Sequence, residues 1–469
     1  MLKIDHSAAE PIYMQICRQL KKQIISGELK TGERLKATRV LCEEYHLSRN
    51  TVLSAYQQLE SEGYVRSRIG SGFYVEELPG FEKAKEDTNL SFKKREKKKT
   101  CRYDFRYGAL EPNLYSTSGF RRALKEATDE LSNKESLFNE EASGLYGLRE
   151  AICQYLFESR DMRVSPDQVL ITGGHHYSIS LLLKILPKSY QTLFMEEPGH
   201  DDSSATFLQA GYQVIPVEVD EGGMKVDLLS EKKRSIVYVT PSHQFPMGAI
   251  LPIARRLQLI SFAKKTHSYI IEDDYDASLR YKERPIPSLF SLDASDCVIY
   301  LGSFSKSLSP DLRISYIVLP AGFDRFSLQE NLLISSPASA LIQLCIEKYI
   351  RSGQYKSRVN KVRNLLKKKH NAILSFLEEN YGDRIKVYGS GGGTHFVLKL
   401  PVSRKQEDIL SFFEARKIRL YPMKDYYIQK DKAAENMVLL GYSGIPLTRL
   451  EDHLGQLKKA LDELLEENS

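Results

Sequence analysis

The stretch Gly302-Ser303-Phe304-Ser305-Lys306-Ser307-Leu308 decides how the fold of this 469-residue chain is interpreted. It follows an apolar run, residues 297–301, which is typical of a buried strand. A lysine directly after such a strand can condense with an aldehyde when its surroundings favour the neutral amine, and Ser303 and Arg313 are suited to hold a phosphate. Pyridoxal phosphate carries both groups. The stretch therefore predicts a pyridoxal phosphate site, with a solvated lysine on a surface loop as the alternative.

Length and composition predict two or three domains, because 469 residues exceed what one ordinary core organises. Hydrophobic residues make up 42% and charged residues 27%, which is typical of soluble globular proteins. No apolar run is long enough to span a bilayer, and the first residues lack the apolar core of a secretion signal. The six cysteines form no close pair, which argues against a disulfide framework or a metal site and predicts a cytoplasmic location.

The net charge of +6 is unevenly distributed. Residues 1–100 hold 19 Lys and Arg against 14 Asp and Glu, whereas the rest of the chain holds 48 against 47. Most of the excess lies in residues 79–100, which hold 8 basic and 4 acidic side chains and few apolar ones. We interpret residues 79–101 as a flexible charged linker, and we expect the basic N-terminal part to meet a polyanion.

The N-terminal part has the pattern of a winged helix-turn-helix. Apolar side chains at helical spacing predict helices over residues 10–27, 38–45 and 49–62. Val40 is expected to face inward from the second helix, and Ser48 is the expected N-cap of the third. Two extended segments around the tip Ile69-Gly70-Ser71-Gly72 predict a two-stranded wing.

This arrangement predicts contact with duplex DNA, because the first residues of a recognition helix enter the major groove. The residues expected to bind DNA are Arg39, Ser48, Arg49, Asn50, Thr51, Arg68 and Gly70. The alternative is a small helical bundle whose arginines are merely solvated.

Residues 1–76 resemble the GntR-type DNA-binding domain. The resemblance rests on Gly32-Glu33-Arg34-Leu35, Leu47-Ser48-Arg49-Asn50-Thr51-Val52, Ala55-Tyr56 and Gly70-Ser71-Gly72. That family usually has Leu-Pro-Ser before the arginine of its second helix, whereas this chain has Leu35-Lys36-Ala37-Thr38-Arg39. The resemblance implies a DNA-binding domain over residues 1–78, with promoter or operator DNA as its partner.

From residue 102 onward, predicted strands and helices alternate, which indicates an α/β domain with a mostly parallel sheet. Polar residues follow each of the predicted strands, which are residues 169–172, 192–196, 236–240, 268–272 and 297–301. Open α/β sheets bind ligands at the carboxyl ends of their strands. We therefore expect these polar residues to converge on one crevice.

A pyridoxal phosphate site needs a lysine for the Schiff base and an acid that pairs with the pyridine nitrogen. Lys306 and Asp273 are suited to these two roles. Tyr275 is expected to reach the phenolic oxygen of the ring, as is Gln244 or His243. Taken singly, each of these residues also has a purely structural interpretation.

The phosphate of the cofactor needs its own ligands. Backbone N–H groups of Gly174 and His175, at the start of a predicted helix, form a phosphate cradle together with Ser303 and Arg313. His200 is expected to lie on the face of the ring.

Residues from about 102 to the end resemble fold-type I aminotransferases, and more closely the aminotransferase-like domain of MocR-type regulators. The motifs that carry the resemblance are Gly144-Leu145-Tyr146-Gly147-Leu148-Arg149-Glu150, Thr172-Gly173-Gly174, Glu197-Pro198-Gly199, Thr240-Pro241-Ser242-His243-Gln244, Glu272-Asp273-Asp274-Tyr275-Asp276 and the stretch around Lys306. The resemblance implies a domain over residues 102–469 with a smaller α+β lobe from about residue 325. It also implies Lys306 as the Schiff-base lysine, Asp273 as the partner of the pyridine nitrogen, and a homodimer, because the family's site uses both subunits.

Two positions depart from that family. His200 stands where its regulators commonly have tyrosine, and Asp202 stands where a carboxylate-binding arginine is common. Regulators that bind an amino-acid carboxylate also have an arginine in the C-terminal lobe, but residues 423–427 and 435–442 contain none. Arg416, Arg419 and Arg449 are the nearby candidates.

The sequence thus predicts a pyridoxal phosphate-dependent transcriptional regulator whose effector is the cofactor or an amine that exchanges with it. The first alternative is a working aminotransferase that carries a DNA-binding module, and partial transaminase activity is compatible with either. The second alternative is a regulator that has lost its cofactor and keeps the large domain as a dimerisation scaffold.

Overall fold

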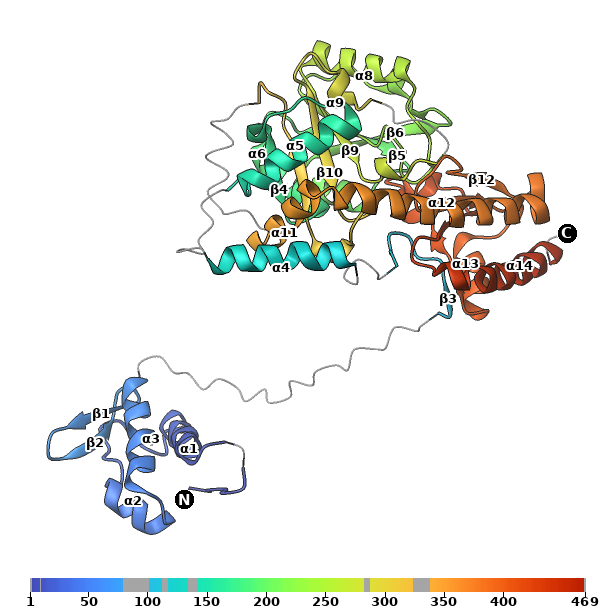
Figure 1. The fold of residues 1–469 in the computed structure, drawn as a ribbon. Helices are drawn as coiled ribbons and strands as arrows, with labels where there is room; N and C mark the ends of the chain where they lie inside the picture. Colours follow the sequence, from blue (N-terminus) through green and yellow to red (C-terminus); the bar gives the residue numbers. More distant parts are fainter. Residues whose placement is uncertain are drawn as a thin grey trace. The chain divides into compact units, whose positions relative to one another are not determined.

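The computed structural model describes residues 2–8, 10–78, 101–111, 117–133, 142–281, 287–323 and 338–467. The chain divides into two compact units, Met1–Lys98 and Lys99–Ser469 (Figure 1). Apart from Cys101, the linker predicted at residues 79–101 lies outside the described residues.

The smaller unit consists of three helices followed by a hairpin. Its elements are α1 (Ile12–Ser26), α2 (Thr38–Tyr45), α3 (Arg49–Ser61), β1 (Val65–Arg68) and β2 (Gly72–Val75). The two strands pair antiparallel, with Val65 opposite Val75 and Arg68 opposite Gly72. Ile16, Val52 and Leu59 are fully buried between the helices. The predicted winged helix-turn-helix is confirmed.

One expectation about this unit is wrong: Val40 is 48% exposed. The two-turn helix α2 buries a single stripe, and Leu41 occupies it, with half-buried Tyr45 one turn later. Val40 precedes Leu41 and is therefore turned from it by about 100° around the helix axis.

The larger unit is built on an eight-stranded sheet with the strand order β4-β11-β10-β9-β8-β5-β6-β7. The strands are β4 (Val169–Thr172), β5 (Thr192–Glu197), β6 (Gln213–Asp220), β7 (Gly223–Met224), β8 (Ser235–Val239), β9 (Tyr269–Asp274), β10 (Val298–Ser303) and β11 (Ser315–Val318). From β10 to β6 neighbouring strands are parallel, whereas β11 is antiparallel to both β10 and β4. The predicted mostly parallel sheet is confirmed, and all five predicted strands are present.

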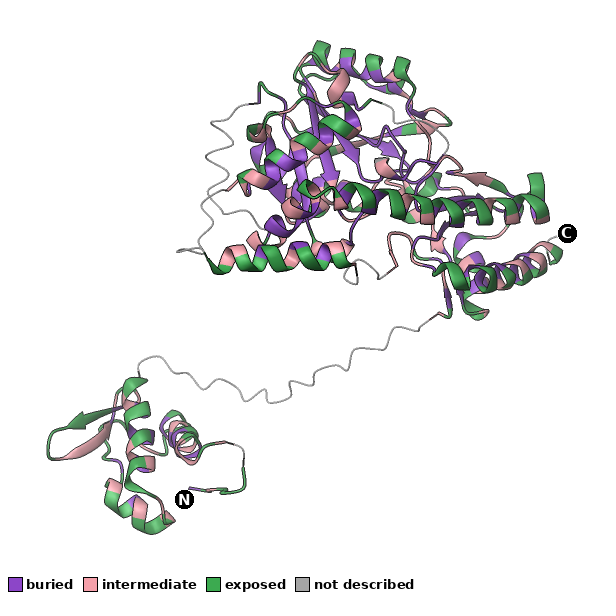
Figure 2. Ribbon diagram, viewed as in Figure 1, coloured by how far each residue is buried: buried purple, intermediate pink, exposed green. Residues whose placement is uncertain are grey.

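Helices cover both faces of this sheet, so that the strands are buried (Figures 1 and 2). The helices are α4 (Ser118–Ser132), α5 (Tyr146–Arg160), α6 (His175–Ile185), α7 (Asp201–Gln209), α8 (Ile253–Thr266), α9 (Leu289–Leu292), α11 (Ala340–Arg351) and α12 (Gln354–Tyr381). Ile271 and Leu301 pack on one face with α6 and α7, while Tyr300 and Tyr316 pack on the other with α4, α5 and α11. None of the helices within the described ranges is long and apolar enough to cross a membrane.

The C-terminal part forms a smaller α+β lobe. Its antiparallel sheet has the order β12-β13-β16-β15. The elements are β12 (Lys386–Tyr388), β13 (His395–Lys399), α13 (Gln406–Ala415), β14 (Ile418–Arg419), β15 (Tyr421–Pro422), β16 (Met437–Gly441) and α14 (Leu450–Glu466). Strand β14 pairs with β3 (Tyr103–Asp104), so the first described segment of the larger unit is fixed to this lobe. The start predicted for the lobe, residue 325, lies outside the described residues.

Candidate functional site

The end of β9 sends two adjacent carboxylates to opposite faces of the sheet, because side chains alternate along a strand. Asp273 shares the face of Ile271, which packs against α6 and α7. Asp274 lies on the other face, where Arg160 of α5 pairs with it. Of these two carboxylates, only that of Asp273 can therefore contact a ligand on the α6 face of the sheet.

The carboxylate of Asp273 is buried with two polar partners. The hydroxyl of Tyr238, on β8, donates a hydrogen bond to Oδ2 of Asp273, and Nε2 of His175 lies 3.7 Å from the same oxygen. Burial raises the pKa of Asp273, and His175 and the hydrogen bond from Tyr238 oppose the rise. A cation placed against this carboxylate relieves the cost of burying its charge, and a protonated pyridine nitrogen is such a cation.

Lys306 lies three residues after the end of β10, and its amine lies beside an N-terminal segment of the larger unit. Its Nζ lies 4.1 Å from the ring centroid of Tyr107, and a Cβ added to Gly108 would lie 3.1 Å from Nζ. Burial lowers the pKa of Lys306 to about 8, although the charges of Asp276 and Asp273 favour the protonated amine. A pKa of about 8 leaves a larger neutral fraction near neutral pH than an ordinary lysine has, and the neutral amine is the nucleophile for an aldehyde.

The candidate phosphate ligands lie on neighbouring strands. Ser303 pairs with Ser315, and Ser315 pairs with Thr172, so the turn after β4 lies beside the loop after β10. Gly174 has φ 102°, and a Cβ added there would lie 3.4 Å from Cζ of Arg313. Helix α6 begins at the next residue, so the Arg313 guanidinium lies beside the start of this helix, where free N–H groups and the helix dipole favour an anion.

The other residues predicted around the ring also come to this region. The ring of His200 lies 4.9 Å from that of His175, measured between centroids, and burial lowers the pKa of His200 well below its ordinary value. The hydroxyl of Tyr275 lies 3.1 Å from Nδ1 of His243. The amide of Gln244 donates to the backbone oxygens of Pro198 and Phe245 and accepts from Met247 N–H, so it holds its own loop together.

Sequence reasoning missed three contributions to this site. Tyr238 was hidden as one aromatic residue of a buried strand, and the side chain of His175 reaches Asp273 although only its backbone was expected to act. Tyr107 comes from a segment about 200 residues before Lys306 in the chain. A hydroxyl within an otherwise aliphatic strand, as at Tyr238, was the one available signal.

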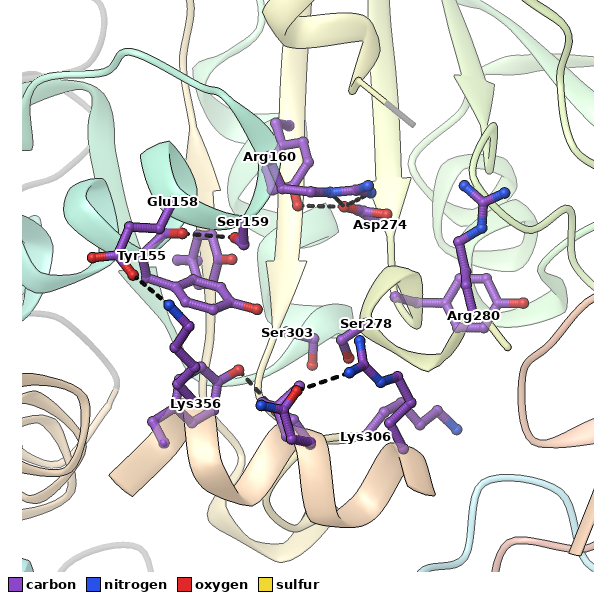
Figure 3. A pocket seen from close by; sticks show the side chains of 18 residues that line it. Tyr155, Glu158, Ser159, Arg160, Asp274, Ser278, Arg280, Ser303, Lys306 and Lys356 are labelled. Carbon is purple, nitrogen blue, oxygen red and sulfur yellow. Dashed lines mark hydrogen bonds and ion pairs between the residues drawn. The ribbon is translucent and has the colours of Figure 1, made fainter. Parts of the chain in front are cut away.

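A cavity of about 320 Å³ lies beside Lys306 on the Asp274 face of the sheet (Figure 3). Ser303 and Tyr275 also line this cavity. Asp273, His175 and His200 are not among its lining residues. Arg160 donates to Asp274 and to Oγ of Ser242, the latter over 2.9 Å. This buried ion pair joins α5 to the end of β9 and has a structural role.

The residues predicted to meet DNA lie at the start of α2, at the start of α3 and on the wing. Oγ of Ser48 accepts from the N–H of Thr51 over 3.1 Å, which confirms the predicted N-cap. Arg49 and Asn50 follow it and are exposed. Three candidates remain. Arg39 is exposed, with its Nε 3.1 Å from Oε1 of Glu43, and the Arg68 guanidinium lies 4.5 Å from the ring centroid of Tyr74. Gly70 lies at the tip of the wing with φ 73°.

Two of the three arginines considered for a ligand carboxylate have acidic partners. Arg416 lies 2.6 Å from Glu463, and Arg419 lies 3.2 Å from Glu414. The described part of the chain contains no cluster of three or more His, Cys, Asp or Glu side chains arranged to hold a metal ion.

Comparison with known proteins gives the same two-part division. Residues 12–75 match the model of bacterial regulatory proteins of the gntR family, and residues 109–429 match aminotransferase class I and II. The uncharacterized HTH-type transcriptional regulator YhdI of Bacillus subtilis is 32% identical over 461 residues, which is 97% of each chain. The probable rhizopine catabolism regulatory protein MocR of Rhizobium meliloti is 27% identical over 481 residues, covering 98% of this chain and 96% of MocR.

The fold of the larger unit is also found in a solved aminotransferase. The α-aminoadipate aminotransferase LysN of Thermus thermophilus, complexed with N-(5'-phosphopyridoxyl)-L-leucine, superimposes with a TM-score of 0.68 at 25% identity and covers 78% of this chain and 93% of LysN. Since both family models match and the similarity to full-length regulators spans nearly the whole chain, the protein belongs to the MocR-type transcriptional regulators, in which a gntR-family helix-turn-helix domain is joined to an aminotransferase class I and II domain.

Proposed function

We propose that the protein is a DNA-binding transcriptional regulator that holds pyridoxal phosphate on Lys306 and responds to the cofactor or to an amine that exchanges with it. One observation carries the proposal: Lys306 with its lowered pKa, the buried carboxylate of Asp273, and Arg313 beside the start of α6 all lie near the ends of neighbouring strands of one sheet. Each matches one part of the cofactor, namely its aldehyde, its ring nitrogen and its phosphate.

When bound, pyridoxal phosphate supplies an aldehyde for the amine and a ring that withdraws electrons. In this proposal the neutral amine of Lys306 would hold the cofactor through its aldehyde, and Asp273 would hold a proton on the ring nitrogen. Tyr238 and His175 hold the carboxylate of Asp273 in position. Arg313 and the start of α6 bind the phosphate, with the Ser303 hydroxyl beside them.

The cofactor is tested by its absorbance and by chemical trapping. The purified protein incubated with pyridoxal phosphate is expected to gain visible absorbance, and borohydride reduction is expected to leave the cofactor's mass on the peptide that contains Lys306. Lys306→Ala should show neither. Lys361→Ala, at an exposed lysine of α12, is the matched control and should behave as wild type. Wild-type protein without the absorbance or the adduct contradicts the cofactor proposal and favours a scaffold that has lost it.

DNA binding is tested on the gene's own upstream fragment. Arg49→Ala is expected to abolish specific retention of this fragment, because the residue is exposed at the start of α3. Arg18→Ala removes an equally charged and exposed side chain from α1 and should have little effect. Unchanged retention by Arg49→Ala would mean that α3 is not the recognition helix.

A second function, transamination, is favoured by the lowered pKa of Lys306, because a catalytic lysine must also release and accept protons. Incubation of the protein with a panel of amino and oxo acids separates the two proposals. Rapid and complete turnover would establish an aminotransferase with a DNA-binding module, whereas slow or partial reaction is what a sensor gives.

Three further points belong to the same proposal. We place the DNA-binding domain at residues 1–78, the linker at 79–101 and the aminotransferase-like domain at 102–469.

We also propose that the protein is cytoplasmic and forms a homodimer. A dimer is expected because aminotransferase sites use two subunits and paired winged helices read paired half-sites. Light scattering of the full chain at micromolar concentration tests the dimer, and a monomer would contradict it.

A further inference from the structure

The solvent-facing side of α12 carries basic side chains over most of its length without any acidic one. Between Gln354 and Leu377 the helix contains seven Lys and Arg and no Asp or Glu. Helix α14, by contrast, mixes Glu451, Asp452, Asp462 and Glu463 with its two lysines. The charge of α12 therefore differs from that of an ordinary exposed helix in the same protein.

Burial separates the seven basic residues into two groups. Arg358 and Lys369 are buried, and Lys369 pairs with Glu111. The others are exposed or half-buried. Lys361, Lys367 and Lys368 are exposed, whereas Lys356 and Arg363 also line the cavity beside Lys306 (Figure 3). We call these five the basic face of α12: Lys356, Lys361, Arg363, Lys367 and Lys368.

Few of these cations are neutralised. Lys356 lies 3.1 Å from Glu158, and Arg363 donates to Asn360 over 3.0 Å. Lys361, Lys367 and Lys368 have no acidic partner among the residues that the structure describes. The exposed positions between them are the uncharged hydrogen-bonding residues Ser357, Asn360 and Asn364. The face thus offers positive charge and hydrogen-bond donors together.

This arrangement lowers the stability of the helix slightly. Like charges four residues apart, such as Arg363 and Lys367, destabilise a helix by about 0.2–0.5 kcal/mol, whereas a Glu at either position would stabilise it by a similar amount. A helix that only needs solvation gains from mixed charge. A face that keeps one sign over several turns is suited to bind a polyanion.

We propose that the basic face of α12 binds the phosphate backbone of duplex DNA, as a contact made by the larger unit in addition to that of the winged helix. The proposal rests on the proposed function, which brings DNA to this chain. Residues 356–368 span about 18 Å at about 1.5 Å per residue. Over that length a duplex presents about ten phosphates on its two strands, at one per about 1.7 Å, so phosphates outnumber the cations of this face.

The contact is independent of base sequence, because lysine ammonium groups bind phosphate as point charges. It should therefore appear in the salt dependence of binding rather than in sequence preference. Each phosphate contact contributes about 0.9 to the slope of log K against log salt concentration. Removing three contacts lowers the slope by about 2.7, so the affinity of wild type relative to the variant grows about 40-fold when salt falls from about 200 to about 50 mM.

The experiment compares three full-length proteins on the gene's own upstream fragment over that salt range. The test variant is Lys361→Gln/Lys367→Gln/Lys368→Gln, which keeps helix propensity and changes only exposed positions. The control is Lys188→Gln/Lys233→Gln/Lys264→Gln, which makes the same change in net charge at exposed lysines elsewhere on the larger unit. Circular dichroism verifies that both variants fold.

The proposal expects a slope reduced by about 2–3 in the test variant and an unchanged slope in the control. Equal slopes in the wild type and the test variant overturn it and leave the proposed function intact. An equal reduction in the control also overturns it, because net charge and not the face of α12 would then be responsible. Wild-type protein that retains no DNA overturns the proposed function, and this inference with it. The wild type could instead retain RNA or anionic vesicles that the test variant does not retain, while both proteins show the same slope of log K for DNA against log salt concentration. That result overturns the proposal and assigns the face to another polyanion.

Discussion

Replacing Lys306 by methionine should stabilise the cofactor-free protein at neutral pH. The ordinary pKa of lysine is 10.5, and burial lowers that of Lys306 to about 8. Since the folded-state pKa lies below the unfolded one, stability is lost as the pH falls from 10.5 through 8, and the loss is complete below 8. At 1.36 kcal/mol for each tenfold change in proton affinity, the cost is about 3 kcal/mol at pH 7 and about 1 kcal/mol at pH 10. Contact of the amine with the ring of Tyr107 favours the charged form, which makes these values upper limits.

Urea unfolding of wild type and Lys306→Met, both freed of aldehyde with hydroxylamine, measures this difference at several pH values. Methionine is an unbranched, uncharged side chain only one atom shorter than lysine. Lys306→Met should therefore be more stable than wild type by up to about 3 kcal/mol at pH 7 and by about 1 kcal/mol or less at pH 10. Lys361→Met, at an exposed position, should show no such pH dependence. A variant that is less stable than wild type at pH 7, or equally stabilised at both pH values, would refute the argument that burial sets the basicity of this lysine.

Three other substitutions test separate parts of the molecule. Asp273→Asn should weaken cofactor binding by about 30-fold, because it removes about 2 kcal/mol of charge-assisted hydrogen bonding, and titration of the visible absorbance measures it. Gly174→Val should also lose cofactor affinity, because φ 102° disfavours a branched side chain and the space in front of it belongs to Arg313; wild-type affinity would argue against the anion site. Ser48→Ala should lower the stability of the smaller unit by about 1 kcal/mol through loss of the N-cap, seen as an earlier transition in thermal unfolding, while the larger unit's transition stays in place.

Local patterns in the sequence predicted the elements, whereas contacts between distant residues decided the site. Ser48 could be identified as an N-cap because the signal is contained within one turn of helix. The role of Tyr238 depends on which residue of β9 it meets across the sheet, and that register is set by packing on both faces. The contact of Tyr107 with Lys306 joins segments about 200 residues apart and has no local signal. Val40 was misplaced because a short amphipathic pattern does not say which of two adjacent apolar residues meets the core.

Asp273 and Asp274 lie on opposite faces of the sheet and have different roles, which has a consequence for the genetics of this protein. The ion pair of Asp274 with Arg160 fixes the end of β9, and through it the direction in which Asp273 points, although Arg160 lies on the opposite face of the sheet. If Asp273 holds the cofactor as proposed, a screen for loss of regulation would recover substitutions at Arg160 together with those at Asp273, and the two groups of variants would have the same phenotype. A one-residue deletion within β9, before Asp273, would shift the following residues by one position, so that Asp274 takes the place of Asp273 on the α6 face and Tyr275 takes the place of Asp274. Such a deletion would keep a carboxylate on the α6 face but remove the ion pair with Arg160.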